Sequence, residues 1–197
     1  MTKVYFVRHA QPDFGCSDVR RRPLTPAGRA DSQKVLEFFK DQRIDTFYCS
    51  PYKRSIDTII DTASWFNMEL MIDERFCERV SGPDGNTKEL MEKRWADFSF
   101  HEDGGESIGE VQVRNIAALF DVLERMQDKS VVIGTHGTAL SSMLNYFDPH
   151  FGFTDFLRII DWMPYIIELD FEPSGEEGRP WKAVRIVEHL HVLKEWK

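Results

Sequence analysis

The chain has 197 residues, of which 42% are hydrophobic and 29% are charged, and its formal net charge at pH 7 is −8. Chains of this length and composition are typical of one globular domain with a sizeable core, so we expect residues 1–197 to form a single domain. Proteins that bind nucleic acid or membrane surfaces normally present a basic face, so the negative charge argues against both kinds of partner.

The cysteines and the first residues bear on localisation. There are three cysteines, Cys16, Cys49 and Cys77, at wide spacing and without a Cys-x-x-Cys pair. An odd number at such spacing is typical of reduced thiols in the cytosol. The amino terminus has one lysine before four consecutive apolar residues, which does not fit a signal peptide, and no apolar run reaches membrane-spanning length. These features predict a cytoplasmic protein.

The first strand is predicted by the apolar, β-branched and aromatic run at residues 4–7, which indicates a strand buried in the centre of a sheet. The run ends at Arg8 and His9, and neither a cation nor an imidazole suits a core. In open α/β sheets, ligands bind just outside the carboxyl ends of the strands. The pair therefore indicates a site that holds an anion beside a nucleophile or a general base.

A polar loop over residues 13–23 leads into the first helix. The loop contains consecutive arginines at 20–22, which suit either a solvated loop or a patch that steers an acidic substrate. Thr25 suits the N-cap and Pro26 the first position of a helix that runs to about residue 40. Its inner face is expected to consist of residues at helical spacing, namely Ala27, Ala30, Val35, Leu36 and Phe39.

The next two strands also end in polar residues. The second strand, about residues 46–49, ends at Ser50 and Pro51, which suit the cap and start of another helix. Arg54 lies in the first turn of that helix, where free N–H groups and the helix dipole already attract anions. The third strand, about residues 69–72, runs into a charged loop that carries three candidate carboxyl groups, Asp73, Glu74 and Glu78.

The segment of about residues 82–105 is expected to form a small helical insertion on the sheet, with a short helix near 88–98. After it, Ser107 and Glu110 have the spacing of a capping box at the start of the longest helix, which extends to about residue 126. The short helix is expected to turn three residues inward, namely Leu90, Met91 and Trp95.

The fourth strand, residues 130–135, again ends on a histidine, His136. Helices are expected at 139–147 and near 155–160. Two strand-like stretches, 165–171 and 183–187, are expected to form a hairpin at the sheet edge. The alternation of strand and helix is typical of βαβ units. The predicted fold is therefore α/β, with a mostly parallel sheet and an antiparallel edge hairpin.

The carboxyl ends of parallel strands lie at one sheet edge, so the residues that follow them can converge. Guanidinium groups clamp phosphate bidentately, and a neutral imidazole can attack phosphorus. A protonated carboxyl group can give its proton to the departing oxygen. We see no metal-ligand cluster, P-loop or zinc-type cysteine pair, and we expect no metal and no cofactor. The candidates are Arg8, His9, Arg54, Glu78 and His136, with Asp73 and Glu74 as rival acids.

Six short motifs in order resemble those of the histidine phosphatase superfamily, the group that includes cofactor-dependent phosphoglycerate mutases. The resemblance covers most of the chain, up to the hairpin, and implies a three-layer α/β/α sandwich. It implies that His9 becomes phosphorylated and that Glu78 is the proton donor. It also implies that Arg8, Arg54 and His136 hold the phosphoryl oxygens. The motifs are Val7-Arg8-His9-Ala10-Gln11, Leu24-Thr25-Pro26-Ala27-Gly28, Ser50-Pro51-Tyr52-Lys53-Arg54-Ser55, Phe76-Cys77-Glu78, Gly105-Glu106-Ser107 and Thr135-His136-Gly137.

Departures from the family pattern bear on the reaction. The usual Arg-His-Gly is Arg8-His9-Ala10 here, and the frequent Gly-x-x-Glu-Gly after the acid is replaced by Arg79-Val80-Ser81-Gly82. Mutases of this family usually carry insertions longer than residues 82–105, which enclose a bisphosphate. The short insertion favours metal-independent hydrolysis of phosphate monoesters through a phosphohistidine. The alternatives are a mutase-type phosphotransferase and a catalytically silent phosphate-binding module.

The remaining expectations concern the substrate and the partners. A small-molecule phosphomonoester is the expected substrate, and Gln11, Thr25 and Arg21 are expected to contribute to its binding. A homodimer would use the edge hairpin together with the apolar segment 151–162.

Overall fold

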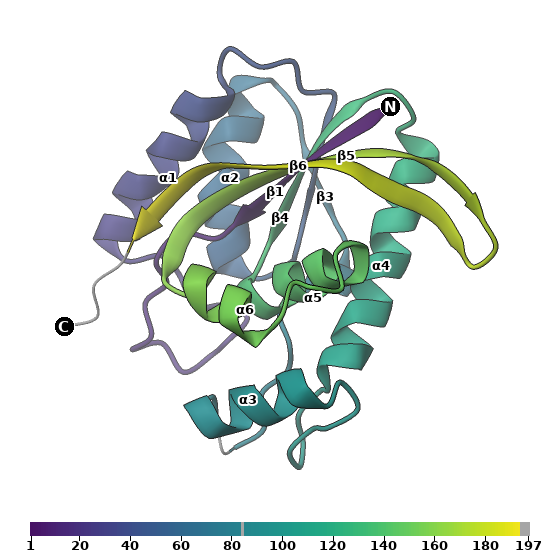
Figure 1. Ribbon diagram of the computed structural model, residues 1–197. Coiled ribbons are helices and arrows are strands. Elements are labelled where there is room, and N and C mark those ends of the chain that lie inside the picture. Colours follow the sequence, from purple (N-terminus) through teal and green to yellow (C-terminus); the bar gives the residue numbers. More distant parts are fainter. Residues whose placement is uncertain (84, 194–197) are drawn as a thin grey trace.

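The computed structural model describes residues 1–83 and 85–193. Its centre is a six-stranded sheet in the order β3-β2-β4-β1-β5-β6 (Figure 1). The strands β3, β2, β4 and β1 are parallel, whereas β5 pairs antiparallel with both β1 and β6. The predicted α/β fold with a mostly parallel sheet and an antiparallel edge hairpin is confirmed.

The central strand β1 (Thr2–Arg8) lies between β4 (Ser130–Thr135) and β5 (Trp162–Glu176). Its side chains alternate between two apolar clusters, one on each face of the sheet. Val4 and Phe6 belong to one cluster, and Tyr5 and Val7 belong to the other. Because both faces are buried, the strand is a continuous apolar run, and the first polar residues mark its end.

Helices cover both faces of the sheet, which gives the three layers α/β/α (Figure 1). On one face, α1 (Pro26–Phe39) and α2 (Lys53–Trp65) pack through residues such as Phe39 and Ile59. On the other face, α4 (Ile108–Arg125) and α5 (Gly137–Phe147) pack through residues such as Leu119 and Leu140. The capping box that was expected at the start of α4 is present.

The buried face of α1 differs from the expected one. Ala27 and Ala30 are exposed, and their places in the interface are taken by Gly28, Asp31 and Ser32. These three residues share one helical face with the buried Val35 and Phe39, because they follow at spacings of three and four. Gly28 is required for close approach, since a Cβ there would lie 2.2 Å from the carbonyl oxygen of Gln11. Thr25 is the N-cap, as expected.

The start of α2 also differs from the expectation. The helix begins at Lys53, its N-cap position is Tyr52, and no side chain caps it. Ser50, at the end of β2 (Thr46–Cys49), is therefore not the helix cap. Its hydroxyl instead lies 2.7 Å from a ring nitrogen of His136. The tertiary contact takes precedence over the local capping propensity of a serine before a proline.

The segment between β3 (Leu70–Ile72) and α4 includes the short helix η1 (Glu74–Phe76) and α3 (Lys88–Ala96). In Figure 1, α3 lies apart from the sheet, beyond its carboxyl-end edge. Leu90, Met91 and Trp95 were expected to point inward, but they are only half-buried and the buried residue of α3 is Arg94. The hydrophobic pattern failed here because this helix packs against α6 (Phe153–Ile159) through Trp95 and against a charged cluster through Arg94, and not against the sheet.

The last part of the chain contains α6 (Phe153–Ile159) and the hairpin of β5 with β6 (Arg179–Leu193). Both strands are 15 residues long and exceed their predicted ranges of 165–171 and 183–187. The additional length pairs only within the hairpin, which projects past the sheet in Figure 1. Residues 175–180 around its turn are exposed, so this part lacks the apolar alternation from which strands are predicted. No helix in the described ranges is both long and apolar enough to cross a membrane.

Candidate active site

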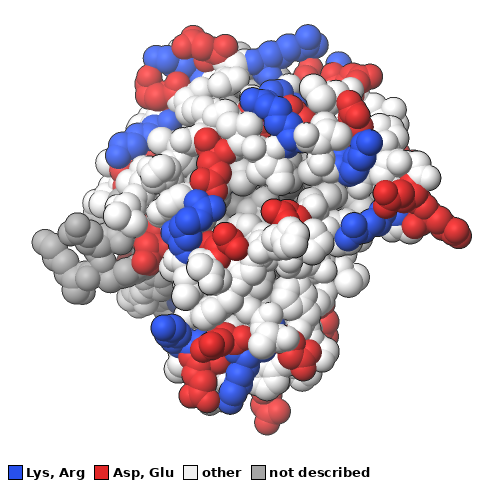
Figure 2. Space-filling model, in the orientation of Figure 1, with Lys and Arg blue, Asp and Glu red and all other residues white. Residues whose placement is uncertain are grey.

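A cavity of about 580 Å³ lies where β1 and β4 end and α5 begins. On the face of the molecule shown in Figure 2, acidic and basic side chains are interspersed. The cavity differs, because five arginines and only two carboxylates line it, although the net charge of the chain is −8. The charged residues of the lining are Arg8, Arg22, Arg54, Arg79, Arg94, Glu78 and Asp161.

His9 directly follows β1 and lines the cavity with only 5% of its surface exposed. Its Nδ1 lies 2.8 Å from the carbonyl oxygen of Ala10. Since a carbonyl oxygen only accepts, Nδ1 carries the hydrogen and Nε2 keeps a free lone pair. Burial, Arg54 and Arg8 lower the pKa of His9 well below its ordinary value. The imidazole is therefore neutral at neutral pH, which is the form that a nucleophile requires.

His136 directly follows β4 and is fully buried. Its ring packs edge-on against that of His9, with centroids 5.3 Å apart, and against Tyr52 at 5.1 Å. Burial and the charge of Arg54 lower its pKa well below the ordinary value. The structure therefore brings the two histidines together, although His136 lies behind His9 and is not in the cavity lining.

Ser50 fixes the orientation of the His136 ring. Its Oγ lies 2.7 Å from His136 Nε2 and accepts from the backbone N–H of Tyr52 at 3.3 Å. The Ser50 hydroxyl can donate to Nε2 or accept from it, and this choice decides which ring nitrogen carries the hydrogen of the neutral imidazole. His136 Nδ1 is buried and has no hydrogen-bond partner among the described residues.

Arg8 ends β1 and is buried against the start of α5. Its Nη1 donates to the carbonyl oxygen of Ile159 at 2.6 Å, while its Nε has no partner in the described ranges. A Cβ on Gly137 would lie 3.1–3.3 Å from the guanidinium, so a glycine after His136 lets Arg8 approach the helix end. Burial lowers the pKa of Arg8 to about 10, and Arg8 stays ionised at neutral pH.

Arg54 is buried in the first turn of α2, as the sequence indicated. Its Nη1 donates to the carbonyl oxygen of Val19 at 2.7 Å, and its guanidinium lies over the ring of Tyr52 at 4.8 Å. Burial lowers its pKa, whereas the carboxylate of Glu78 raises it. These contacts leave the guanidinium in the cavity lining beside Arg8 and His9.

Glu78 follows η1 and lines the cavity. Its carboxylate accepts from the backbone N–H groups of Thr138 at 3.0 Å, Ala139 at 3.1 Å and Arg79 at 2.8 Å. Two of these donors are the free N–H groups of the first turn of α5, where a carboxylate is stabilised. The contact joins the loop that carries Glu78 to the helix that follows His136.

The two rival acids lie elsewhere. Asp73 pairs with Arg75 at 2.7 Å and caps η1 with its side chain. Glu74 is exposed and pairs with Arg20 at 2.6 Å. Neither belongs to the cavity lining, so Glu78 is the one of the three carboxyl groups that reaches the site.

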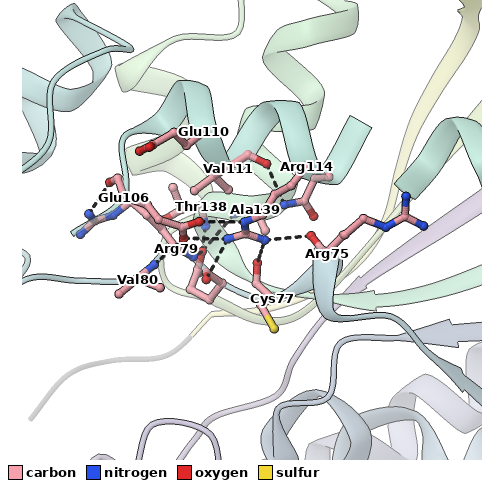
Figure 3. A network of polar contacts seen from close by, with 12 residues as sticks. Arg75, Cys77, Arg79, Val80, Glu106, Glu110, Val111, Arg114, Thr138 and Ala139 are labelled. Carbon is pink, nitrogen blue, oxygen red and sulfur yellow. Dashed lines mark hydrogen bonds and ion pairs between the residues drawn. The ribbon is translucent and has the colours of Figure 1, made fainter. Parts of the chain in front are cut away.

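Arg114 of α4 holds the backbone of the Glu78 loop in place, as Figure 3 shows. It donates to the carbonyl oxygens of Arg75 and Cys77, both at 2.8 Å, and to that of Glu78 at 3.1 Å. The Glu106 carboxylate accepts two further bonds from it at 2.9 Å. One guanidinium group therefore binds three carbonyl oxygens within residues 75–78 of the loop, and no sequence motif revealed this role.

Three residues that were expected to bind substrate lie outside the lining. Thr25 donates to the side-chain oxygen of Gln11 at 3.1 Å and caps α1, so the two hold the helix start. The side chain of Arg21 is 88% exposed and faces Asp18. Arg22 lines the cavity instead, with its Nε bonded to the Cys16 carbonyl oxygen at 3.0 Å. Three arginines in a row show no hydrophobic or polar pattern that separates them. The path of the backbone in the folded chain is therefore needed to identify Arg22 as the one that faces the cavity.

Side chains that could ligate a metal do not cluster in the part of the chain that the structure describes. Among the residues that the structure describes, no group of three or more His, Cys, Asp or Glu side chains could hold a metal ion. His189 and His191 of β6 have His-x-His spacing, but His189 bonds Glu168 at 2.7 Å and His191 stacks on Trp162 at 4.3 Å.

A family model described as "Histidine phosphatase superfamily (branch 1)" matches residues 4–181. The chain belongs to this superfamily. Two curated relatives of the family are similar over most of their lengths. Phosphoserine phosphatase 1 of Hydrogenobacter thermophilus is 26% identical over 157 residues, covering 73% of this chain and 74% of the relative. The uncharacterized phosphatase PhoE of Bacillus subtilis is 28% identical over 149 residues, covering 73% of this chain and 76% of its own.

Solved structures of histidine phosphatases show the same fold. Phosphoserine phosphatase of Entamoeba histolytica in complex with 3-phosphoglyceric acid superposes with a TM-score of 0.73 at 20% identity, over 94% of this chain and 96% of the other. Mycobacterial glucosyl-3-phosphoglycerate phosphatase gives a TM-score of 0.73 at 16% identity, over 92% and 96%. At these identities the likeness establishes the architecture of the histidine phosphatase fold alone.

Proposed function

We propose that this histidine phosphatase hydrolyses phosphate monoesters through a phosphohistidine at His9. The observation that carries the proposal is the state of the His9 imidazole. It is neutral, its Nδ1 is bonded to Ala10, and its Nε2 lone pair is free in a cavity lined by arginines. Family membership and relatives that are named phosphatases support the same activity.

In the first step, His9 Nε2 attacks the phosphorus atom in line with the ester oxygen. The Nε2–P bond forms, the P–O bond to the leaving group breaks, and Glu78 gives its proton to the departing oxygen. The imidazole hydrogen stays on Nδ1, bonded to the Ala10 carbonyl. Negative charge spreads over the three equatorial oxygens during transfer, and the ionised Arg8, Arg54 and Arg22 guanidinium groups stabilise it.

In the second step, a water molecule attacks the phosphohistidine. Glu78, now a carboxylate, takes the proton from the water, the O–P bond forms and the Nε2–P bond breaks. His9 returns to its neutral form and inorganic phosphate leaves. In this mechanism the Ser50 hydroxyl donates to His136 Nε2, so that Nδ1 carries the imidazole hydrogen and donates to a phosphoryl oxygen. Nδ1 is buried beside His9 and has no partner in the described chain, which supports this role.

The reaction as proposed assigns every role to a side chain, and the guanidinium groups supply the positive charge that a metal would supply elsewhere. We therefore propose that it needs no metal. The substrate is proposed to be a small phosphomonoester, since a cavity of about 580 Å³ falls in the size range of small-molecule sites. Cytoplasmic localisation stays a prediction from the cysteines.

The test is hydrolysis of p-nitrophenyl phosphate in excess EDTA between pH 5 and 8. His9→Ala should abolish turnover, while His150→Ala, at an exposed histidine in the turn after α5, should leave it unchanged. Glu78→Gln should slow the second step most, because an aryl leaving group departs without a proton. The variant should then accumulate an enzyme heavier by one phosphoryl group, visible by intact mass spectrometry after a rapid alkaline quench.

Turnover in a folded His9→Ala variant would refute the phosphohistidine. Dependence of turnover on an added bisphosphate, with the phosphoryl group passed to a second substrate and not to water, would instead identify a mutase.

A further inference from the structure

A second charged cluster lies in the wall of the cavity, formed by Arg79, Arg94 and Glu102. Arg79 Nη1 lies 3.0 Å from Glu102 Oε1, and Arg94 Nη2 lies 2.7 Å from the same oxygen. Arg94 Nε also donates to Glu102 Oε2 at 3.0 Å. All three side chains are only 3% exposed. Ion pairs with so little exposure are rare in a segment that packs away from the main core.

The cluster carries one positive charge in excess. Burial alone would raise the pKa of Glu102, but hydrogen bonds from the Gly82 backbone, Arg94 and Arg79 lower it to about 2. Burial and the charge of Arg94 lower the pKa of Arg79. Two guanidinium groups thus share one carboxylate. The other partners of the two guanidinium groups are neutral. Arg79 donates to the Glu106 carbonyl oxygen at 2.8 Å, to Ser81 Oγ at 3.2 Å and to Asn86 Oδ1 at 3.1 Å, and Arg94 donates to the Gly85 carbonyl oxygen at 2.9 Å. These contacts satisfy hydrogen bonds but do not balance the charge, so the cluster attracts an anion.

Arg79 and Arg94 line the cavity, whereas Glu102 lies behind them. They come from other segments than the arginines beside His9, because Arg8 ends β1 and Arg54 lies in α2, whereas Arg94 lies in α3 and pairs with the same carboxylate as Arg79. The cavity therefore has one basic group beside His9 and another in the wall that includes α3. Met91 and Trp95 of α3 lie beside the second group, and Trp95 packs against Phe156 at 5.4 Å.

We propose that the Arg79–Glu102–Arg94 cluster is a second anion subsite, which binds a carboxylate on the leaving group of the phosphomonoester. This inference rests on the proposed function. In the first step Glu78 is protonated and carries no charge. Among the described residues, the five guanidinium groups of the lining are then opposed by two carboxylates, Asp161 and Glu102, which leaves three positive charges. A phosphate dianion leaves one positive charge in excess, and one carboxylate balances it.

The number of surplus positive charges indicates which kind of anion the subsite binds. One surplus charge matches a carboxylate, whereas a second phosphate would add two negative charges. Arg94 Nη1 carries two hydrogens and donates to Asn86 Oδ1 at 2.9 Å, which leaves one N–H directed elsewhere. A charge-assisted bond from such a donor typically changes affinity roughly tenfold to a hundredfold.

The test compares two substrates of similar size and shape, 3-phosphoglycerate and glycerol 3-phosphate. The first has a carboxylate at the position where the second has a hydroxymethyl group. For the unaltered protein, kcat/KM should favour 3-phosphoglycerate by about tenfold or more. Hydrolysis of both substrates with equal kcat/KM overturns the subsite but leaves the proposed phosphatase function standing. Failure to hydrolyse p-nitrophenyl phosphate or either ester refutes the proposed function itself.

Two substitutions change the cluster in opposite directions. Arg94→Gln makes the cluster neutral and should bring the ratio of the two kcat/KM values close to one. Glu102→Gln leaves both arginines and should maintain or raise the ratio. The ratio within one variant does not depend on how much of that variant is folded.

A purely structural clamp would change both substrates alike in both variants, so an unmoved ratio in Arg94→Gln overturns the proposal. A higher kcat/KM for propane-1,3-diol bisphosphate than for 3-phosphoglycerate also overturns it, because the subsite would then select a second phosphate.

Discussion

Removing the hydroxyl group of Ser50 should harm both stability and activity. Ser50 and His136 are both fully buried, and the 2.7 Å contact between them is the polar contact that the structure gives to the His136 ring. In Ser50→Ala, both ring nitrogens of His136 would lack a protein partner, because Nδ1 already has none in the described ranges. A buried polar group left without a partner costs about 1–3 kcal/mol, so the free energy of unfolding should fall by about that amount.

The same substitution should lower kcat. Without the Ser50 hydroxyl, the His136 ring loses the contact that fixes its orientation and, in the proposed mechanism, its alignment with the phosphoryl group. Loss of one oriented donor to a transition-state oxygen costs up to roughly 10²–10³ in rate, and partial misorientation should cost about tenfold. The assays are urea unfolding followed by tryptophan fluorescence, and p-nitrophenyl phosphate turnover under saturating substrate.

Ser141→Ala is the matched control. Ser141 is also fully buried, but its hydroxyl has no hydrogen-bond partner among the described residues. Its removal should leave stability unchanged or slightly raised and should leave kcat unchanged. If Ser50→Ala loses stability without a loss of kcat, Ser50 is only a structural group, and the reasoning about His136 is refuted.

Three further predictions concern other parts of the site. Arg22→Ala should raise KM and lower kcat/KM for p-nitrophenyl phosphate by about tenfold or more, because Arg22 lines the cavity. Arg21→Ala should change neither constant, because the Arg21 side chain is exposed. Equal effects of the two substitutions would contradict the assignment of Arg22 to the phosphate. Arg114→Met should lower kcat by at least tenfold with KM little changed, because the substitution frees the loop that carries Glu78, the proposed proton donor. Steady-state kinetics measure both constants, and an unchanged kcat would contradict this role of Arg114. Finally, His9 and His136 are neutral when folded, so below pH 6.5 the unfolded chain binds protons that the folded chain does not. The free energy of unfolding should therefore fall with acidification by up to about 1.4 kcal/mol per pH unit for each histidine, and in His9→Ala the slope between pH 6.5 and 5 should be smaller by that amount; parallel profiles would argue against a buried neutral His9.

The layers of the fold and the centre of the site were predictable for one physical reason. Strands buried on both faces are continuous apolar runs, and polar residues that interrupt them mark the sheet edge. Arg8, His9 and His136 lie next to such ends, and the structure brings them together. The sequence contained this information locally, within a few residues of each strand.

The residues that were missed depend on contacts between distant segments. Ser50 has the local pattern of a helix cap, but its partner is 86 residues away. Arg94 lies in a helix whose apolar pattern predicted a different buried face, because Glu102 and Arg79 compose its surroundings. Thr25 was correctly predicted as a cap, and its contact with Gln11 holds the helix start. Local patterns predict an element well, but they do not reveal which polar group a folded chain will place opposite it.

The division of the cavity between two segments has a consequence for how such a protein can diversify. In the proposed mechanism the phosphate is held by residues at the sheet edge, which every substrate needs in the same positions. The proposed subsite for the leaving group includes α3, which lies apart from the sheet and is anchored through Glu102. Substitutions in and around α3 can therefore alter substrate range while the geometry around the transferred phosphoryl group is kept. Close relatives would then be expected to share a reaction and to differ in the metabolites they process, with most of the divergence confined to a few turns of chain.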